Sequence, residues 1–388
     1  MNLELQQISK TVGSETHLYP LSLRLQEGQM NVLLGPTQAG KTSLMRIIAG
    51  LDQPDAGQVL VDGQDVTGMP VRERKLAMVY QQFINYPGLT VFENIAAPLR
   101  IQRCPLEEIS QRVQAMAAKL HIEHLLQRLP GELSGGQQQR TALARALVKR
   151  ASLVLLDEPL VNLDYKLREE LREELLSLFT DGGTTVVYAT TEPQEALLLG
   201  GHTFVLDAGR LLQSGPTLAT YHAPNCVRVS AIFNDPPMNL LPATVLGSSV
   251  VRLEDGTELP LSGRNLNLTA GQRCQIGVRC HHLRVVPAGA AANTSVSASA
   301  ENLPAASAPA ATDSGSCAGV TLDCVLDLAE LSGSETFLHL HHGGVLLVAQ
   351  WPGVHELALG SALKVFLQAQ DVFIFNMDGA LLCAPQGA

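Results

Sequence analysis

Continuous apolar runs in the first 235 residues predict buried strands that alternate with helices. The runs are residues 31–35 (NVLLG), 76–80 (LAMVY), 153–157 (LVLLD) and 184–190 (TTVVYAT). Strands that are buried on both faces read as unbroken apolar segments, which is typical of a parallel sheet covered by helices. We therefore expect an α/β domain with a mostly parallel sheet over residues 1–235.

The segments between these runs carry helix and turn signals. From residue 1 to about residue 30, apolar and polar residues alternate, and the turn Val12-Gly13-Ser14 interrupts them. This pattern predicts short strands on both sides of the turn. A helix is expected from Thr42 to Ala49, because Gly50 is a typical residue after a helix end. Residues 90–150 read as largely helical, with a break at Leu129-Pro130-Gly131.

Residues 236–388 show a different pattern, which predicts an all-β module. The segment Asn234-Asp235-Pro236-Pro237 reads as a linker, and short strand-like runs with turn residues follow it. Residues 288–318 are rich in Ala, Ser and Pro and offer little apolar surface to bury, so we expect a flexible insertion within this module.

A phosphate-binding loop is predicted directly after the 31–35 run. The motif GxxxxGK[ST] is met by Gly35, Pro36, Thr37, Gln38, Ala39, Gly40, Lys41 and Thr42. The strand, loop and helix occur in the order that this motif requires. Backbone N–H groups would surround the phosphates, Lys41 would neutralise the β- and γ-phosphates, and Thr42 would bind Mg²⁺.

One acidic residue ends the 153–157 run and a second follows it directly. Asp157 would hold Mg²⁺ through water, and Glu158 would act as the general base that polarises the attacking water. The alternative is that both acids lie on a surface turn after a strand. The four preceding apolar residues and Pro159 argue against that alternative.

A third motif, LSGGQ, bears on how two subunits would share a nucleotide. Leu133, Ser134, Gly135, Gly136 and Gln137 (LSGGQ) stand at an expected helix start, where free N–H groups and the helix dipole favour an anion. They lie too far from the chain's own phosphate loop to serve it. We therefore expect them to contact a nucleotide bound to a second subunit.

With these motifs, residues 1–235 resemble the ABC ATPases: a P-loop NTPase with a RecA-like core plus a helical subdomain, binding ATP and Mg²⁺. The resemblance implies that Ser43 joins the nucleotide-binding residues, and that Gln81 reaches the Mg²⁺ and the water while its loop responds to the membrane partner. Asn162-Leu163-Asp164 matches the D-loop at the dimer interface. Arg140 and Arg145 follow LSGGQ on the same expected helix. The alternative to a functional role for these two arginines is that they are charges on a solvated surface.

The chain departs from this family at three positions. Thr191 stands where the family has a histidine that reaches the γ-phosphate, and threonine offers only a neutral hydroxyl. Val12 stands where an aromatic residue stacks on adenine, with Tyr19 as a possible substitute. Gln38 replaces a glycine of the loop, and we expect it to fit with a negative φ.

These departures motivate a hypothesis about assembly. The chain's own ATP site is weakened at Thr191, whereas the parts lent to a partner, from Ser134 to Gln137 and Asp164, are intact. This suits a heterodimer with a second, different ATPase subunit. The alternative is a working homodimer in which the Thr191 hydroxyl or water replaces the imidazole.

The C-terminal module resembles the OB-like (TOBE) regulatory domain of carbohydrate-type importer ATPases such as those of maltose importers. The matching segments are PPMNLL (236–241), GVR (277–279) with HLR (282–284), and FIF (373–375). Segments 78–87 and 189–201 most resemble ATPase subunits of bacterial glycerol importers. The resemblance implies two transmembrane permease subunits as partners, a periplasmic solute-binding protein indirectly, and a peripheral place on the cytoplasmic face of the inner membrane.

Composition narrows the classes of function that this chain can have. The chain has 388 residues, enough for two domains, and its net charge of −10 argues against nucleic-acid binding. We expect no membrane-spanning segment, no signal peptide at the start MNLELQQISK, and reduced thiols for the seven scattered cysteines. A cluster of histidines at 281–282 and 339–342 lacks a full metal-ligand set at regular spacing. The rival functions are a soluble ABC ATPase of translation or DNA repair, and a non-hydrolysing, ATP-binding regulatory subunit.

Overall fold

A computed structural model describes residues 1–161, 165–179, 183–247, 249–261, 269–286 and 319–385. These residues form two compact units, Met1–Thr220 and Tyr221–Ala388. The predicted linker at residues 234–237 lies inside the second unit, directly after a helix. The predicted insertion at residues 288–318 and the D-loop residue Asp164 lie outside the described residues.

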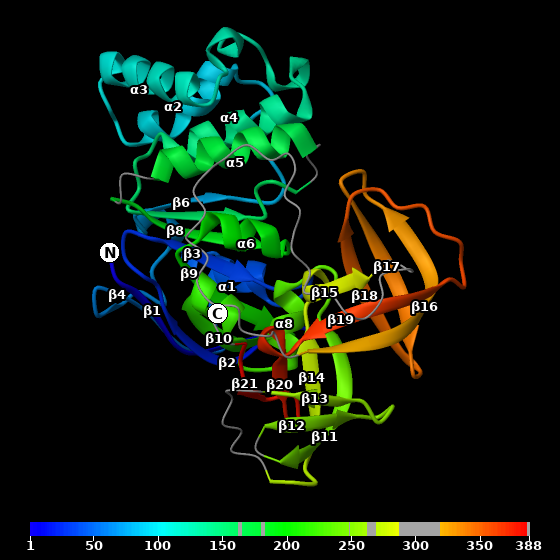
Figure 1. Cartoon of the computed structure of the whole chain (residues 1–388). Helices are drawn as coiled ribbons and strands as arrows, with labels where there is room; N and C mark the ends of the chain where they lie inside the picture. Colours follow the sequence, from blue (N-terminus) through cyan, green and yellow to red (C-terminus); the bar gives the residue numbers. More distant parts are fainter. Residues whose placement is uncertain (162–164, 180–182, 248, 262–268, 287–318, 386–388) are drawn as a thin grey trace, which may run out of the picture. The chain divides into compact units, whose positions relative to one another are not determined.

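The first unit contains two sheets, both visible in Figure 1. A six-stranded sheet has the order β10-β9-β3-β8-β7-β6, with parallel pairing from β9 through to β6. A four-stranded antiparallel sheet has the order β2-β1-β4-β5. The strands are β1 (Leu3–Val12), β2 (Glu15–Arg24), β3 (Met30–Leu34), β4 (Ala56–Val61), β5 (Gln64–Asp65), β6 (Leu76–Val79), β7 (Leu153–Asp157), β8 (Thr185–Thr190), β9 (His202–Asp207) and β10 (Arg210–Pro216).

The helices of this unit follow the predicted alternation, with α2, α3 and α4 gathered together at one end of the unit in Figure 1. The helix bounds are α1 (Lys41–Ala49), α2 (Val91–Ile101), α3 (Leu106–Lys119), α4 (Gly135–Leu147), α5 (Tyr165–Phe179) and α6 (Pro193–Leu199). Helix α7 (Thr217–His222) begins in this unit and ends two residues into the second. Short 3₁₀ turns lie at Val71–Glu73, Glu123–Leu125 and Pro130–Glu132. The last of these is the expected break before LSGGQ, so the α/β prediction is confirmed, including its helical subdomain.

The central strands are apolar because both of their faces are covered. All five residues of β7 and all six of β8 are buried, and one apolar core joins β3, β7 and β8 to α1. The register places Leu34 beside Thr190 and Asp157 beside Ala189. The carboxyl ends of β3, β8 and β7 therefore meet at one edge of the sheet, where loops of an open α/β sheet collect ligands.

The second unit is all-β apart from one helix and two 3₁₀ turns, in the part of the chain that the structure describes. Its sheets have the orders β13-β12-β11-β14-β20-β21 and β15-β19-β16-β17-β18, and they share one apolar core. The elements are α8 (Val227–Phe233), β11 (Asn239–Gly247), β12 (Val250–Leu253), β13 (Glu258–Pro260), β14 (Arg273–Val278), a 3₁₀ turn (Cys280–His282), β15 (Leu283–Val286), β16 (Gly319–Leu331), β17 (Glu335–His342), β18 (Val345–Pro352), β19 (Ala362–Gln368), a 3₁₀ turn (Ala369–Asp371), β20 (Phe373–Phe375) and β21 (Leu381–Cys383).

Three histidines of β17 pair with carboxylates. His339 Nε2 lies 3.2 Å from Glu330 Oε1, His342 Nε2 lies 3.0 Å from an Asp255 oxygen, and His341 contacts Asp327. The described residues contain no group of three or more His, Cys, Asp or Glu side chains placed to hold a metal. Each of these imidazoles therefore lies beside a carboxylate of its own.

Candidate nucleotide-binding and hydrolysis site

The phosphate loop lies between β3 and α1, as the motif predicts. Its first residue, Gly35, donates its N–H to the Thr190 carbonyl at the end of β8 (3.3 Å). A Cβ on Gly35 would lie 2.2 Å from the Leu206 carbonyl oxygen, so only glycine fits there. Gly40 has φ 96° and precedes α1, and a Cβ there would lie 2.9 Å from the His17 carbonyl oxygen. Tight contacts with neighbouring backbone thus require both glycines.

Gln38 departs from the expectation for this loop. Its φ is 68°, in the left-handed region, and not negative as we expected. The loop needs the backbone conformation that glycine adopts freely, and the glutamine adopts it at a cost of about 1 kcal/mol or more. The expectation was wrong because the path from Gly35 to the start of α1, and not the residue type, sets this dihedral angle.

Lys41 is held at the centre of the site. Its side chain is only 4% exposed, and Nζ donates to the carbonyls of Gly35 (2.8 Å) and Pro36 (3.0 Å). Nζ also lies 3.2 Å from Glu158 Oε1. Burial lowers the pKa of Lys41, while the Glu158 carboxylate acts in the opposite direction. The ammonium is thus positioned by carbonyls and balanced by one carboxylate.

Thr42 and Asp157 form the candidate metal-binding pair. The Thr42 hydroxyl donates to Asp157 Oδ1 (3.2 Å), and Asp157 is 2% exposed at the end of β7. Burial raises the pKa of Asp157, and the Thr42 hydrogen bond opposes this rise. A hydroxyl and a carboxylate are hard oxygen donors, which fit Mg²⁺ together with water and phosphate oxygens. A divalent cation bound beside this buried carboxylate would stabilise its charged form.

Glu158 lies at the junction of the site's loops. Its N–H donates to the Ala189 carbonyl (3.0 Å), and its φ of 46° turns the chain sharply after β7. The side chain contacts Lys41 on one side and accepts a hydrogen bond from Gln81 Nε2 (3.0 Å) on the other. Strained non-glycine residues gather at functional sites because the surrounding structure holds them in place. The two acids therefore do not lie on an open surface turn.

The LSGGQ residues form the start of α4. Ser134 caps the helix, and its hydroxyl accepts a hydrogen bond from the Gln137 N–H (3.4 Å). Gln137 Oε1 accepts from the Ser134 N–H in return (3.1 Å), which completes a capping box. A Cβ on Gly135 would meet no atom within 4 Å, so no neighbour within the chain requires the absence of a side chain there. The helix start presents free N–H groups beside a surface glycine.

The two arginines after LSGGQ are not solvated surface charges. Arg140 is 9% exposed and lies 3.2 Å from Glu174 of α5. Arg145 donates to the Ile84 carbonyl in the loop after β6, and burial lowers its pKa. Both side chains therefore tie α4 to neighbouring segments.

The positions where the chain departs from family residues lie at the edges of the site. Thr191 directly follows β8 and is partly buried. Val12 ends β1 with 51% of its surface exposed. Tyr19 carries the guanidinium of Arg210 over its ring, 3.7 Å from the ring centre. One face of the Tyr19 ring is therefore already covered within the chain.

Sequence reasoning missed a buried hydrogen-bond cluster behind Thr191. Glu195 Oε2 accepts from the Thr190 hydroxyl (2.6 Å) and from the Tyr188 hydroxyl (3.1 Å), and burial raises the Glu195 pKa. The Thr190 hydroxyl also accepts the Glu192 N–H (3.0 Å). The cluster fixes the turn after β8. The only signal for it in the sequence is an acid three residues into a short helix, which does not reveal its partners.

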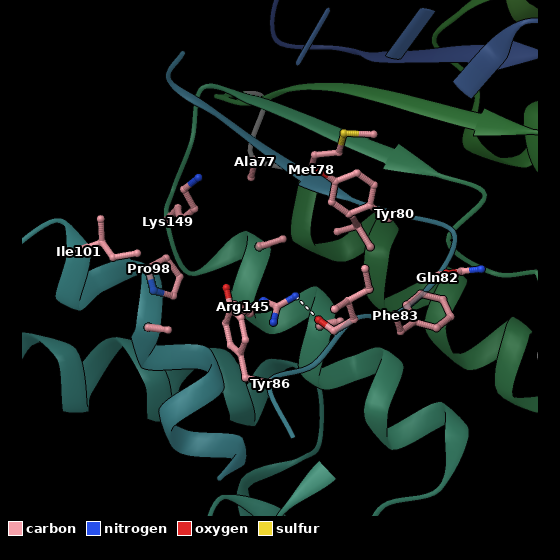
Figure 2. Close-up of a pocket in the computed structure, with 15 residues that line it drawn as sticks. Ala77, Met78, Tyr80, Gln82, Phe83, Tyr86, Pro98, Ile101, Arg145 and Lys149 are labelled. Atoms are coloured by element: carbon pink, nitrogen blue, oxygen red, sulfur yellow. Dashed lines mark hydrogen bonds between the residues drawn. The ribbon is translucent and has the colours of Figure 1, made fainter. Parts of the chain in front are cut away.

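A groove lies beside the site, between the loop after β6 and helices α2 and α4. It encloses about 190 Å³. Figure 2 shows Arg145 near its centre, with Tyr86 and Phe83 from the loop and Pro98 and Ile101 from α2. Ile101 is 83% exposed, so apolar surface at this rim faces solvent. Tyr80 and Gln82, on either side of Gln81, line the groove, so the same loop borders both the site and the groove.

The parallel sheet, the phosphate loop and the carboxylates at its edge define a P-loop ATPase of the ATP-binding cassette class. The family model described as "ABC transporter" matches residues 18–161, and "MalK OB fold domain" matches residues 235–283. The chain belongs to the ABC transporter ATP-binding proteins of the importer type, with a C-terminal OB fold.

Curated relatives cover nearly the whole chain. The trehalose/maltose import ATP-binding protein MalK of Thermococcus litoralis is 33% identical over 385 residues, 96% of this chain and 97% of the relative. The sn-glycerol-3-phosphate import ATP-binding protein UgpC of Escherichia coli K12 is 33% identical over 376 residues, 96% of this chain and 97% of the relative. The chain is an ATPase of this family, and the expected α/β and OB-fold architecture is confirmed.

Solved structures match the first part of the chain. The dimeric structure of the bacterial ABC transporter cassette MJ0796 is 30% identical, with a TM-score of 0.52, covering 55% of this chain and 98% of the cassette. A second structure of this cassette, in a post-hydrolysis state bound to ADP and Pi, has a TM-score of 0.51 over the same coverage. The family therefore binds ATP and forms dimers. In this chain, no helix among the described residues is long and apolar enough to cross a bilayer.

Proposed function

We propose that this chain couples ATP binding and hydrolysis to the uptake of glycerol, or of a similar small polyol or sugar, by a bacterial ABC importer. The observation that carries the proposal is the meeting of Lys41, Thr42, Asp157, Glu158 and Gln81 at one edge of the parallel sheet. Relatives named for trehalose/maltose and for sn-glycerol-3-phosphate import support this class of solute. The solute itself would bind to partner subunits.

In this proposal, residues 1–235 form the ATPase domain and residues 236–388 a regulatory OB-like domain. The phosphate-loop N–H groups and Lys41 bind the β- and γ-phosphates, and Ser43 contributes its backbone N–H at the start of α1. Thr42, Asp157 and Gln81 hold Mg²⁺, which when bound neutralises phosphate charge. Phosphate oxygens compete with Glu158 for the Lys41 ammonium, 3.2 Å from that carboxylate. Binding ATP thereby frees Glu158 to accept a proton from the attacking water.

The proposed assembly has two ATPase subunits face to face. The start of α4, with Leu133, Ser134, Gly135, Gly136 and Gln137, would contact the nucleotide of the second subunit. Asp164 would join it from the D-loop. Because Thr191 supplies no imidazole, we propose that the partner is a different chain and that hydrolysis occurs mainly at the partner's site.

The proposed permease contact is the groove of Figure 2. Its walls combine exposed apolar side chains with Arg145 and Lys149, which suits a helical segment with an acidic residue. The Gln81 loop forms part of both the groove and the site, so closure of the ATPase dimer would move the groove. Two permease subunits would receive this movement at the cytoplasmic face of the inner membrane. A periplasmic solute-binding protein would be an indirect partner, through the permease subunits.

One experiment separates the proposed heterodimer from its alternatives. The importer is reconstituted in vesicles, and transport is measured with Glu158→Gln in this chain or with the matching change in the second ATPase. Removing a general base costs about 100-fold or more in rate. The proposal expects the partner's change to stop transport and E158Q to leave most of it. Equal losses would instead support two equivalent sites, as in a homodimer.

A further inference from the structure

His17 lies against the phosphate loop from the side of the antiparallel sheet. It is a residue of β2, and its Nδ1 lies 3.1 Å from the hydroxyl oxygen of Ser43 in α1. A Cβ on Gly40 would lie 2.9 Å from the His17 carbonyl oxygen, so the backbones of β2 and the loop are in close contact. None of the motifs in the sequence includes this histidine.

Two hydroxyls in the first turn of α1 mark the two sides of the phosphate site. Thr42 turns toward Asp157, which is the side of the metal and the γ-phosphate. Ser43, the next residue, turns toward His17 and the β1–β2 hairpin. A phosphate chain that runs along the loop from Asp157 therefore reaches the α-phosphate near Ser43 and His17. The nucleoside would leave the loop on this side, toward the exposed Val12.

The hydrogen bond with Ser43 also bears on which ring nitrogen carries a proton. When the serine hydroxyl donates to Nδ1, the neutral imidazole carries its N–H on Nε2. Nε2 has no hydrogen-bond partner among the described residues. The ring is partly buried, so its orientation is restrained by packing as well as by Ser43.

We propose that His17 is a nucleotide-binding residue whose Nε2–H donates a hydrogen bond to the α-phosphate of ATP. The contact rests on the proposed nucleotide site and adds a donor to it. It strengthens binding in a chain where Val12 provides no aromatic ring to stack on adenine. Because ADP and ATP share the α-phosphate, His17 contributes equally to the affinity for both.

The test is calorimetric titration of the full chain with Mg²⁺ and either ADP or a non-hydrolysable ATP analogue. A hydrogen bond to a charged group is worth about tenfold in affinity. We expect H17V to weaken both nucleotides about tenfold, and H17Q, which keeps an N–H donor, to recover part of the loss. T16V, an exposed neighbour on the same strand, should bind as the wild type does.

The outcomes separate this inference from the proposed function. Wild-type affinity in H17V, or a loss confined to the ATP analogue, overturns the α-phosphate contact. A wild-type chain that binds neither nucleotide overturns the proposed ATP site instead. Thermal melting without nucleotide checks that H17V is folded.

Discussion

Replacing Gln38 by glycine should stabilise the first unit of the chain. Gln38 has φ 68°, and its side chain is exposed, so truncation removes no packed contact. Relief of a left-handed conformation in a non-glycine residue gains about 1–2 kcal/mol. The greater freedom of glycine in the unfolded chain takes back about 0.5–1 kcal/mol. The expected net gain is therefore about 0.5–1 kcal/mol.

The assay is thermal unfolding of the chain without nucleotide, measured by calorimetry. For a unit of this size, 1 kcal/mol corresponds to a shift of about 2–4 °C in Tm, so the Q38G unit should melt about 1–4 °C higher. Q38A is the matched control, because it removes the side chain but keeps the positive φ, and it should show no gain. A Q38G protein that melts at or below the wild-type temperature would refute the strain reasoning.

Two further predictions concern charge. Burial raises the pKa of Asp157 above 3.8, so the charged carboxylate costs stability at neutral pH and the cost fades as the pH falls through the raised pKa. D157N should therefore melt higher than wild type at pH 7 without Mg²⁺-ATP, with no difference below the unfolded pKa; equal melting at pH 7 would contradict this. In the groove, Arg145→Glu should weaken co-purification with the permease about tenfold or more, whereas Arg72→Glu, at a side chain that is 83% exposed and outside the groove, should not; equal effects would argue against docking there.

The parts of the fold that could be predicted are those where one physical cause dominates. The strands before the phosphate loop and before Asp157 are unbroken apolar runs because both faces are covered, and the helix after the loop begins at Lys41 and ends before Gly50. In each case burial or a local turn decides the element. Strands β9 and β10, the last two strands on one side of the same sheet, lie outside the runs that we identified.

The parts that could not be predicted depend on contacts between distant segments. The positive φ values of Gln38 and Glu158 arise from the path of each loop between fixed strand and helix ends. The burial of Arg140 depends on Glu174, 34 positions along the chain, and the role of His17 depends on Ser43, on a different element. Local sequence patterns contain no record of these partners.

The central claim is that this chain works as one half of an asymmetric pair, and one measurement tests it most directly. ATP hydrolysis is measured for the purified chain alone and for the chain mixed with the second ATPase subunit of its importer, with Thr191→His as a companion variant. The account predicts little activity alone, high activity in the mixture, and a gain in the isolated chain on introducing the imidazole. Full activity of the isolated wild-type chain, unchanged by the partner, would contradict it and support a working homodimer.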